Sequence, residues 1–194
     1  STSILIQISR MYYKGLVTTR TQNAARTVID DISRSIQFSG ETPSYPPSNN
    51  QSITTPHYFC IGKTRYTYFK NMQRASANDL PNQKILHVLW KDEVVSPSNC
   101  GTALPNLQNP IPSTGGKELL EKGMRIGNQG VPSASIIKSS NGVYQINLLV
   151  FYGDNGVINF DTSTGDPLYC KGALTGAQFC AFSNLSTEVY NRVQ

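Results

Sequence analysis

The first forty residues carry apolar side chains at the spacing of one helix face. Positions three and four apart recur along the series Ile4, Ile8, Met11, Gly15, Thr18, Gln22, Ala25, Ile29, Ile32 and Ile36. This spacing predicts one continuous helix with a stripe that is apolar at both ends and weak in the middle. The segment AARTVIDDISRSIQFSG, residues 24–40, ends in Ser39 and Gly40, which favour a helix stop after Phe38.

The middle of the predicted helix contains poor helix formers. The sequence GLVTTRTQN, residues 15–23, combines a glycine with three threonines and an asparagine, so we expect a kink or a loosened turn near Gly15. A helix from Ser3 to Phe38 would be about 54 Å long at ~1.5 Å per residue. A globule formed by the rest of the chain would be only about 40 Å across, so about nine residues would extend beyond it.

The predicted overhang is largely apolar. Its apolar members are Ile4, Leu5, Ile6, Ile8, Met11, Tyr12 and Tyr13. Exposed apolar surface of this kind usually marks a missing partner. We therefore expect that a hydrophobic segment precedes Ser1 and that the helix belongs in a membrane or in a bundle of helices. In the alternative interpretation, residues 1–13 bend back and pack on the domain.

Short strands and turns follow the helix. A loop rich in Pro, Ser and Asn covers residues 41–56, after which HYFCIG and TRYTYFK predict two strands around a turn at Gly62 and Lys63. KILHVLWK, residues 84–91, predicts a third strand, and a long connection with several prolines follows over residues 94–116. From Asp154 the chain is rich in turns and ends in a short segment, NLSTEVYNRVQ.

The strongest strand pattern is SASIIKSSNGVYQINLLVFYG, residues 133–153. Asn141 and Gly142 are the pair that favours a tight hairpin turn. Alternate positions after the turn place a set of apolar side chains on one face: Tyr144, Ile146, Leu148, Val150 and Tyr152. The apolar stripe at the C-terminal end of the helix is predicted to cover this face. The fold class is therefore α+β, with one long N-terminal helix packed on an antiparallel sheet.

Composition favours an exported domain. Only 15% of the residues are charged, compared with about 25% in an ordinary domain. The 17 Lys+Arg and 12 Asp+Glu are scattered along the chain, so the net charge of +5 indicates no nucleic-acid-binding patch. The four cysteines form no CxxC pair and favour two disulfides over a zinc site: Cys60, Cys100, Cys170 and Cys180.

Two further clusters suggest binding chemistry. Asp154, Asp161 and Asp166 lie among glycines and side-chain oxygens, the ligands that calcium prefers, but they lack the spacing of an EF-hand. Aspartates that stabilise turns are the commoner explanation. The sequence GKTRYTYFKNMQR, residues 62–74, mixes basic and aromatic side chains as single-strand-binding faces do. The ordinary alternation of a strand explains the same pattern.

The sequence contains none of the motifs that mark the common catalytic sites. GxSxG, HExxH, the P-loop and the dinucleotide fingerprint are all missing from it, and the histidines His57 and His87 are isolated from each other. We therefore expect neither an enzymatic activity nor a cofactor.

Three segments together resemble a known family. They are AARTVIDDISRSIQFSG, then GMRIGNQGVPSASIIKSSNGVYQINLLVFYGD, and finally GAQFCAFSNLSTEVYNR near the C-terminus. The first is similar to the second half of the spine helix of type IV pilins, and the second to the central strands of minor pilins. The chain thus resembles the soluble part of a type IV pilin or of a type II secretion pseudopilin. The resemblance implies one pilin-like domain over residues 1–194, with a spine helix over 1–39 and a globular sheet-and-loop part over 40–194.

The resemblance also implies a function. A minor pilin is a structural subunit of a bacterial type IV pilus that contributes to filament assembly and to surface adhesion or twitching motility. Expected partners are other pilin subunits through the helix, the cytoplasmic membrane through a transmembrane half-helix upstream of Ser1, and a host or neighbouring cell surface. Nucleic acid is not expected as a partner. The assembly residues would be Ile4, Ile8, Met11, Ala25, Ile29, Ile32 and Ile36.

Such a subunit is anchored in the membrane before assembly and lies in the extracellular filament afterwards. A pseudopilin, or an unrelated secreted binding domain, is the alternative. In the pilin-like interpretation Cys170 and Cys180 close the C-terminal loop, which would stabilise the fold by about 2 to 3 kcal/mol. Cys60 is then left to pair with Cys100, although four cysteines allow three connectivities.

Overall fold

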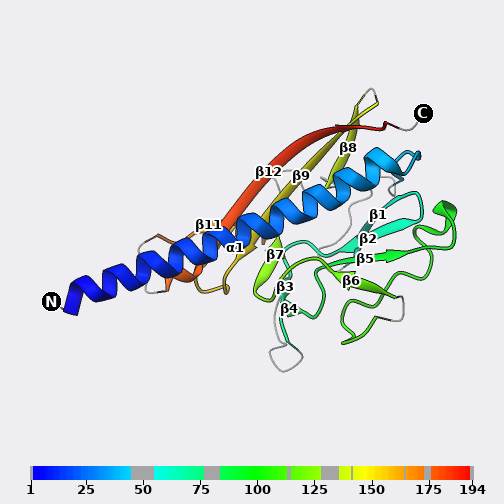
Figure 1. Cartoon of the computed structure of the whole chain (residues 1–194). Helices are drawn as coiled ribbons and strands as arrows, with labels where there is room; N and C mark the ends of the chain where they lie inside the picture. Colours follow the sequence, from blue (N-terminus) through cyan, green and yellow to red (C-terminus); the bar gives the residue numbers. More distant parts are fainter. Residues whose placement is uncertain are drawn as a thin grey trace.

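Helix α1 (Thr2–Phe38) runs along one side of the molecule, and the strands pack beside its C-terminal part (Figure 1). The computed structural model describes the following parts of the chain: residues 2–44, 55–76, 84–112, 115–127, 136–140, 142–163, 165–172 and 176–192. The strands in these parts form mainly antiparallel sheets. The predicted α+β class, with one long helix on antiparallel sheets, is confirmed.

The first sheet contains the hairpin that the sequence predicts around Gly62 and Lys63. Its strands, in spatial order, are β1 (His57–Ile61), β2 (Thr64–Tyr68), β5 (Leu89–Glu93) and β6 (Gly116–Glu118). Ile61 pairs with Thr64, so two residues form the turn. Gly62 has a φ of +58°, a left-handed conformation that glycine adopts without the steric cost of a Cβ.

The second sheet is built around β9 (Val143–Tyr152). Its other strands are β12 (Ala181–Tyr190), β7 (Met124–Ile126) and β8 (Ile137–Ser140). Ser140 pairs with Val143, which confirms the predicted hairpin between β8 and β9; Asn141 lies outside the described residues. The side chains predicted to share one face of β9 are indeed its inward side: four are at most 6% exposed and that of Tyr152 is half-buried.

Two segments differ from their predicted structure. KILHVLWK is divided between β4 (Lys84–Ile85), which pairs with β3 (Gln73–Arg74), and β5 of the first sheet. Between β4 and β5 the backbone N–H of His87 donates to Leu107 O, which belongs to neither sheet partner, so the segment is not one continuous strand. The C-terminal segment, expected to be short, belongs to the ten-residue strand β12, which pairs with β9 along its whole length. Its inward positions include Ser183 and Thr187, so the apolar alternation that marks a strand is weak there.

The remaining described elements are short. They are β10 (Ile158–Phe160), β11 (Pro167–Cys170) and the 3-10 turns η2 (Pro97–Asn99) and η3 (Ala177–Phe179). β10 and β11 pair with each other in antiparallel fashion. η2 lies in the long connection predicted over residues 94–116, and η3 comes directly before Cys180.

No loosened turn interrupts the helix at Gly15, because α1 is helical from Thr2 to Phe38. Two of the three threonines that make this stretch a poor helix former donate their hydroxyls to the helix backbone. Thr18 Oγ1 donates to Lys14 O at 2.7 Å, and Thr21 Oγ1 donates to Val17 O at 2.8 Å. The hydroxyls therefore have partners without breaking the helix.

One hydrophobic core joins the helix to both sheets. The helix contributes side chains that are at most 7% exposed: Ala25, Val28, Ile29, Ile32 and Ile36. Phe59, Tyr66 and Tyr68 of the first sheet and Ile146, Leu148 and Val150 of the second lie in the same cluster. The helix is thus the element that closes the core, as the sequence predicts for its C-terminal stripe.

Histidine 57 in β1 makes the fold sensitive to acid. Its ring stacks on Tyr68, with ring centroids 5.3 Å apart, and burial, assisted by the charge of Lys70, lowers its pKa to about 4. An exposed histidine has a pKa of about 6.5. Between these two values the unfolded chain binds more protons than the folded one, so stability falls as the pH falls.

We expect the free energy of unfolding to decrease by about 1 to 2 kcal/mol between pH 7.5 and pH 4.5 through this one group. In His57→Gln the decrease should be smaller by that amount, as measured by urea denaturation at both pH values. His87 serves as a control of opposite sign, because its contact with Glu118 raises its pKa; His87→Gln should enlarge the loss in acid. Equal losses in wild type and His57→Gln would contradict the assignment.

Candidate assembly surface

The N-terminal part of α1 projects beyond the sheets (Figure 1). Its apolar side chains are exposed by fractions that range from 46% for Tyr13 to 76% for Met11: Ile4, Leu5, Ile6, Ile8, Met11, Tyr12 and Tyr13. The first buried side chain of the helix is that of Val17, which is 5% exposed. The predicted overhang is confirmed, and the alternative in which this segment bends back onto the domain is wrong for the described residues.

Apolar side chains surround most of the projecting helix. At 3.6 residues per turn they cover more than half of its circumference, and the remaining stripe contains Gln7, Arg10 and Lys14. This polar stripe is in line with buried side chains of the C-terminal part of α1, since Lys14, Val17 and Thr21 are three and four residues apart. Among the apolar side chains, Ile4, Ile8 and Met11 lie in line with the Ile29 and Ile36 edge of that buried stripe, and Leu5, Ile6, Tyr12 and Tyr13 lie on other sides of the helix.

The helix leaves the domain at the C-terminal disulfide region. Lys14 Nζ donates a hydrogen bond to Cys180 O, and burial lowers the pKa of Lys14. The Tyr13 ring centroid lies 5.7 Å from that of Phe179, which is itself 46% exposed. These contacts end the packed part of α1, so every described residue before Tyr13 depends on something outside the domain for burial.

An ion pair attaches the C-terminal half of α1 to the first sheet. Lys91 Nζ on β5 lies 2.9 Å and 2.8 Å from the two carboxylate oxygens of Asp31. The Tyr66 hydroxyl on β2 donates to Asp31 Oδ2 at 2.8 Å and lies 2.9 Å from Ser35 Oγ. Burial raises the pKa of Tyr66, so its hydroxyl keeps its proton and remains a donor. This polar cluster determines where along the sheet the helix sits.

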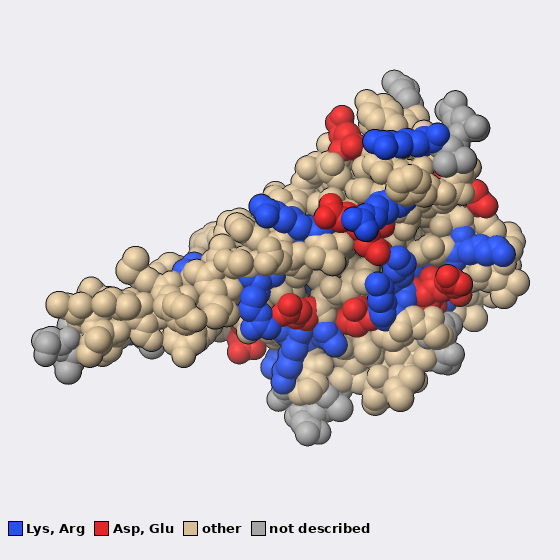
Figure 2. All heavy atoms as spheres, viewed as in Figure 1, with Lys and Arg blue, Asp and Glu red and all other residues tan. Residues whose placement is uncertain are grey.

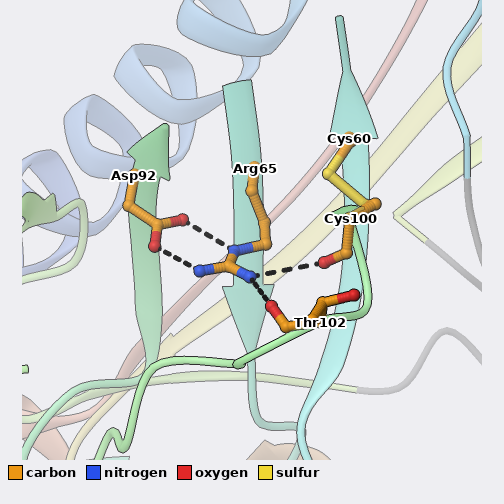
Figure 3. Close-up of a disulfide and its surroundings, with 5 residues drawn as sticks. All are labelled: Cys60, Arg65, Asp92, Cys100 and Thr102. Atoms are coloured by element: carbon orange, nitrogen blue, oxygen red, sulfur yellow. Dashed lines mark hydrogen bonds and ion pairs between the residues drawn. A yellow bond between two sulfur atoms is a disulfide. The ribbon is translucent and has the colours of Figure 1, made fainter. Parts of the chain in front are cut away.

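The Cys60–Cys100 disulfide closes a loop whose ends are 40 residues apart in sequence. Beside it, the Arg65 guanidinium donates to both carboxylate oxygens of Asp92 at 2.9 Å and 2.6 Å, and to Thr102 O at 2.9 Å (Figure 3). Arg65 and Asp92 are 1% and 3% exposed, and a buried pair of this kind requires its full set of hydrogen bonds. The disulfide and the ion pair together hold the loop after η2 against β1 and β2.

The second disulfide joins Cys170 to Cys180, ten residues apart, so both expected pairings are present. It links β11 to the start of β12, next to the point where the helix leaves the domain. Disulfides persist in oxidising environments. The two bonds therefore indicate an oxidising, extracytoplasmic location.

The three aspartates considered for calcium have separate side-chain partners, although Asp161 N donates to Asp166 O at 2.8 Å. Asp161 Oδ1 accepts from the backbone and hydroxyl of Ser163, as a turn-stabilising aspartate does. Asp154 accepts from Gln73, and Asp166 accepts from Asn71. In the part of the chain that the structure describes, no group of three or more His, Cys, Asp or Glu could hold a metal ion.

The mixed basic and aromatic segment over residues 62–74 does not form one exposed face. Tyr66 and Tyr68 lie in the core, and Arg65 and Lys70 are at most 5% exposed. Residues 64–68 form a strand, as the ordinary explanation has it, but this strand is buried on both faces and does not alternate between buried and exposed positions.

Sequence reasoning missed Asp31, Lys91 and Lys14 as residues that position the helix. Asp31 lies three residues after Val28 and four before Ser35, at the margin of the buried stripe. A charged side chain at such a margin indicates a partner of opposite charge on the facing sheet. The sequence does not show which residue this is, because Lys91 is 60 residues away. Of the assembly residues inferred from the pattern, Ile4, Ile8 and Met11 are exposed, and the other four lie in the core.

The architecture is pilin-like: a long N-terminal helix packs on antiparallel sheets, and a disulfide closes a loop near the C-terminus. Comparisons of the chain with protein-family models, with curated proteins and with solved structures find no match. Within the described residues, no helix has a stretch both long and apolar enough to span a bilayer.

Removal of the Asp31 carboxylate tests the attachment of the helix. Asp31→Ala leaves Lys91 without its counter-ion and removes the carboxylate that accepts from the Tyr66 hydroxyl, which should lower the free energy of unfolding by about 1 to 3 kcal/mol. The neighbouring Asp30 is exposed, so Asp30→Ala is a matched control that should change stability by less than about 0.5 kcal/mol. Chemical denaturation followed by circular dichroism measures both, and equal effects would contradict the role of Asp31.

Proposed function

We propose that this protein is a structural, non-enzymatic subunit of a type IV pilus, of the minor pilin kind. The observation that carries the proposal is the projecting end of α1, whose apolar side chains from Ile4 to Tyr13 are 46% to 76% exposed. In a filament this end would pack between the corresponding helices of neighbouring subunits. The sheets and loops would face outward, where they could contribute to adhesion or twitching motility.

The energetics of burial support assembly through the helix. Full burial of an isoleucine or leucine side chain stabilises by about 1.5 to 3 kcal/mol, and the projecting segment offers Ile4, Leu5, Ile6 and Ile8 within two turns. A helix that is apolar on most sides gains most when partners surround it. Because its exposed apolar side chains lie on several sides, such a helix can contact more than one neighbour.

The location of the domain supports the same proposal. Pilus subunits are assembled outside the cytoplasm, and the two disulfides indicate an oxidising compartment. We propose that a membrane segment upstream of the described helix anchors the subunit before assembly. A type II secretion pseudopilin would use its helix in the same way, so the experiment must separate the two.

The test is carried out in the cells that encode the protein. Leu5→Glu and Met11→Glu should each remove the subunit from sheared surface filaments by at least tenfold on an immunoblot, because a carboxylate would have to be buried between apolar helices. Val95 and Ile111 are 87% and 84% exposed on the globular part. Val95→Glu and Ile111→Glu make the same chemical change there and should leave incorporation unchanged.

Purified Leu5→Glu and Met11→Glu should unfold at the wild-type denaturant midpoint, since neither side chain is buried in the domain. Wild-type incorporation of both helix variants would refute assembly through this surface. If wild-type filaments lack the protein and its deletion blocks protein secretion instead, the pseudopilin alternative is correct.

A further inference from the structure

A hollow of about 630 Å³ lies beside the helix, near the point where α1 leaves the sheets. Four basic side chains line it: Arg20 on α1, Arg74 on β3, Lys84 on β4, and Lys122 just before β7. The space-filling view shows lysine and arginine side chains gathered below the helix over β3 and β4, with carboxylates between them (Figure 2). The volume lies within the range of sites that bind small ligands.

The basic side chains of the hollow exceed its acidic ones. Arg20 pairs with Glu121 at 2.5 Å, an exposed pair at the margin. Arg74 Nη1 donates to a neutral acceptor, Leu120 O, and neither Arg74 nor Lys84 forms an ion pair within the described residues. Lys122 Nζ donates to Ser76 Oγ at 3.2 Å. A cleft lined by charge of one sign raises the local concentration of ligands of the opposite sign.

One exposed carboxylate lies among these cations. Asp154 lines the same hollow, and its Oδ1 accepts from Gln73 Nε2 at 3.2 Å. The Gln73 amide also donates to Gly153 O at 3.0 Å, so Asp154 is not needed to satisfy it. A carboxylate in a basic site repels a ligand that has only anionic groups, but it accepts hydrogen bonds from hydroxyls. The site therefore fits a ligand that carries both.

Two aromatic rings complete the wall. Phe179 is 46% exposed, and Tyr152 is half-buried with the Arg20 guanidinium 5.9 Å from its ring centroid. A Cβ at Gly123 would come within 3.0 Å of Tyr152, so the ring lies directly against the turn before β7. Aromatic faces of this kind provide an apolar surface for the C–H groups of a ligand ring.

We infer that this hollow binds an acidic saccharide. The acid groups of the sugar contact the basic side chains, a hydroxyl donates to Asp154, and a sugar ring lies against Tyr152 or Phe179. A DNA strand is the less suitable ligand, because its sugar-phosphate backbone offers Asp154 no hydrogen-bond donor. The inference concerns the globular part alone and does not depend on filament assembly.

Isothermal titration calorimetry of the purified chain tests the inference with three probes: trigalacturonate, neutral maltotriose and a short thymidine oligonucleotide. Trigalacturonate should bind, and maltotriose should bind at least tenfold more weakly. Lys84→Gln combined with Lys122→Gln should weaken trigalacturonate binding by about three- to tenfold. Arg26→Gln combined with Lys117→Gln removes the same charge from exposed positions outside the hollow and should change binding by less than about twofold.

Asp154→Ala distinguishes an acidic-saccharide site from a merely cationic surface. It should weaken trigalacturonate binding by at least threefold, whereas on a cationic surface the loss of a negative charge would strengthen it. The inference is overturned if trigalacturonate does not bind at millimolar concentration, if Asp154→Ala strengthens its binding, or if the oligonucleotide binds more tightly. Circular dichroism of each variant confirms that the fold is retained, and Lys84→Gln alone provides a milder variant if the double substitution unfolds.

Discussion

The length and rigidity of one helix determine the rest of the structure. After its first turn, the backbone N–H groups of α1 are bonded four residues back, so 37 residues form a rod of about 55 Å that cannot follow the surface of the domain. The sheets cover only the part that begins near Tyr13 and Val17. The apolar side chains before this point are therefore left in solvent by geometry, although the composition of the segment favours burial.

The rod is useful only if its attachment to the domain is firm. Apolar contacts stabilise the packing of the C-terminal part of α1 but are not directional. The Asp31 carboxylate, bound by Lys91 and Tyr66, adds directional contacts to one sheet, and Lys14 bonds the other end of the packed segment to Cys180 O. Asp31 lies at the lateral margin of the buried stripe, and Lys14 lies at the N-terminal end of that stripe. Together they determine how far the helix projects and which of its sides face outward.

The two surfaces that the fold presents differ in chemistry because they arise in different ways. The projecting helix is a local surface, made by residues adjacent in sequence, and its apolar sides suit partners of the same kind. The basic hollow is assembled from α1, β3, β4 and the turns beside β7 and β9. Both adjoin Phe179, directly before the C-terminal disulfide. That disulfide thus supports the region where assembly and ligand binding would meet.

The sequence alone determined the features that depend on local periodicity. The helix and its stop after Phe38, the hairpins at Gly62 and Gly142 and the α+β class follow from spacings within a few residues. The apolar overhang follows from the length of that helix compared with the size of a compact domain. Only the tertiary structure decided the division of KILHVLWK into two strands, the length of β12, the burial of Arg65 against Asp92 and the meeting of four basic side chains in one hollow. These features depend on residues tens of positions apart, whose contacts are set by how the sheets pack on the helix, and no local pattern encodes that packing.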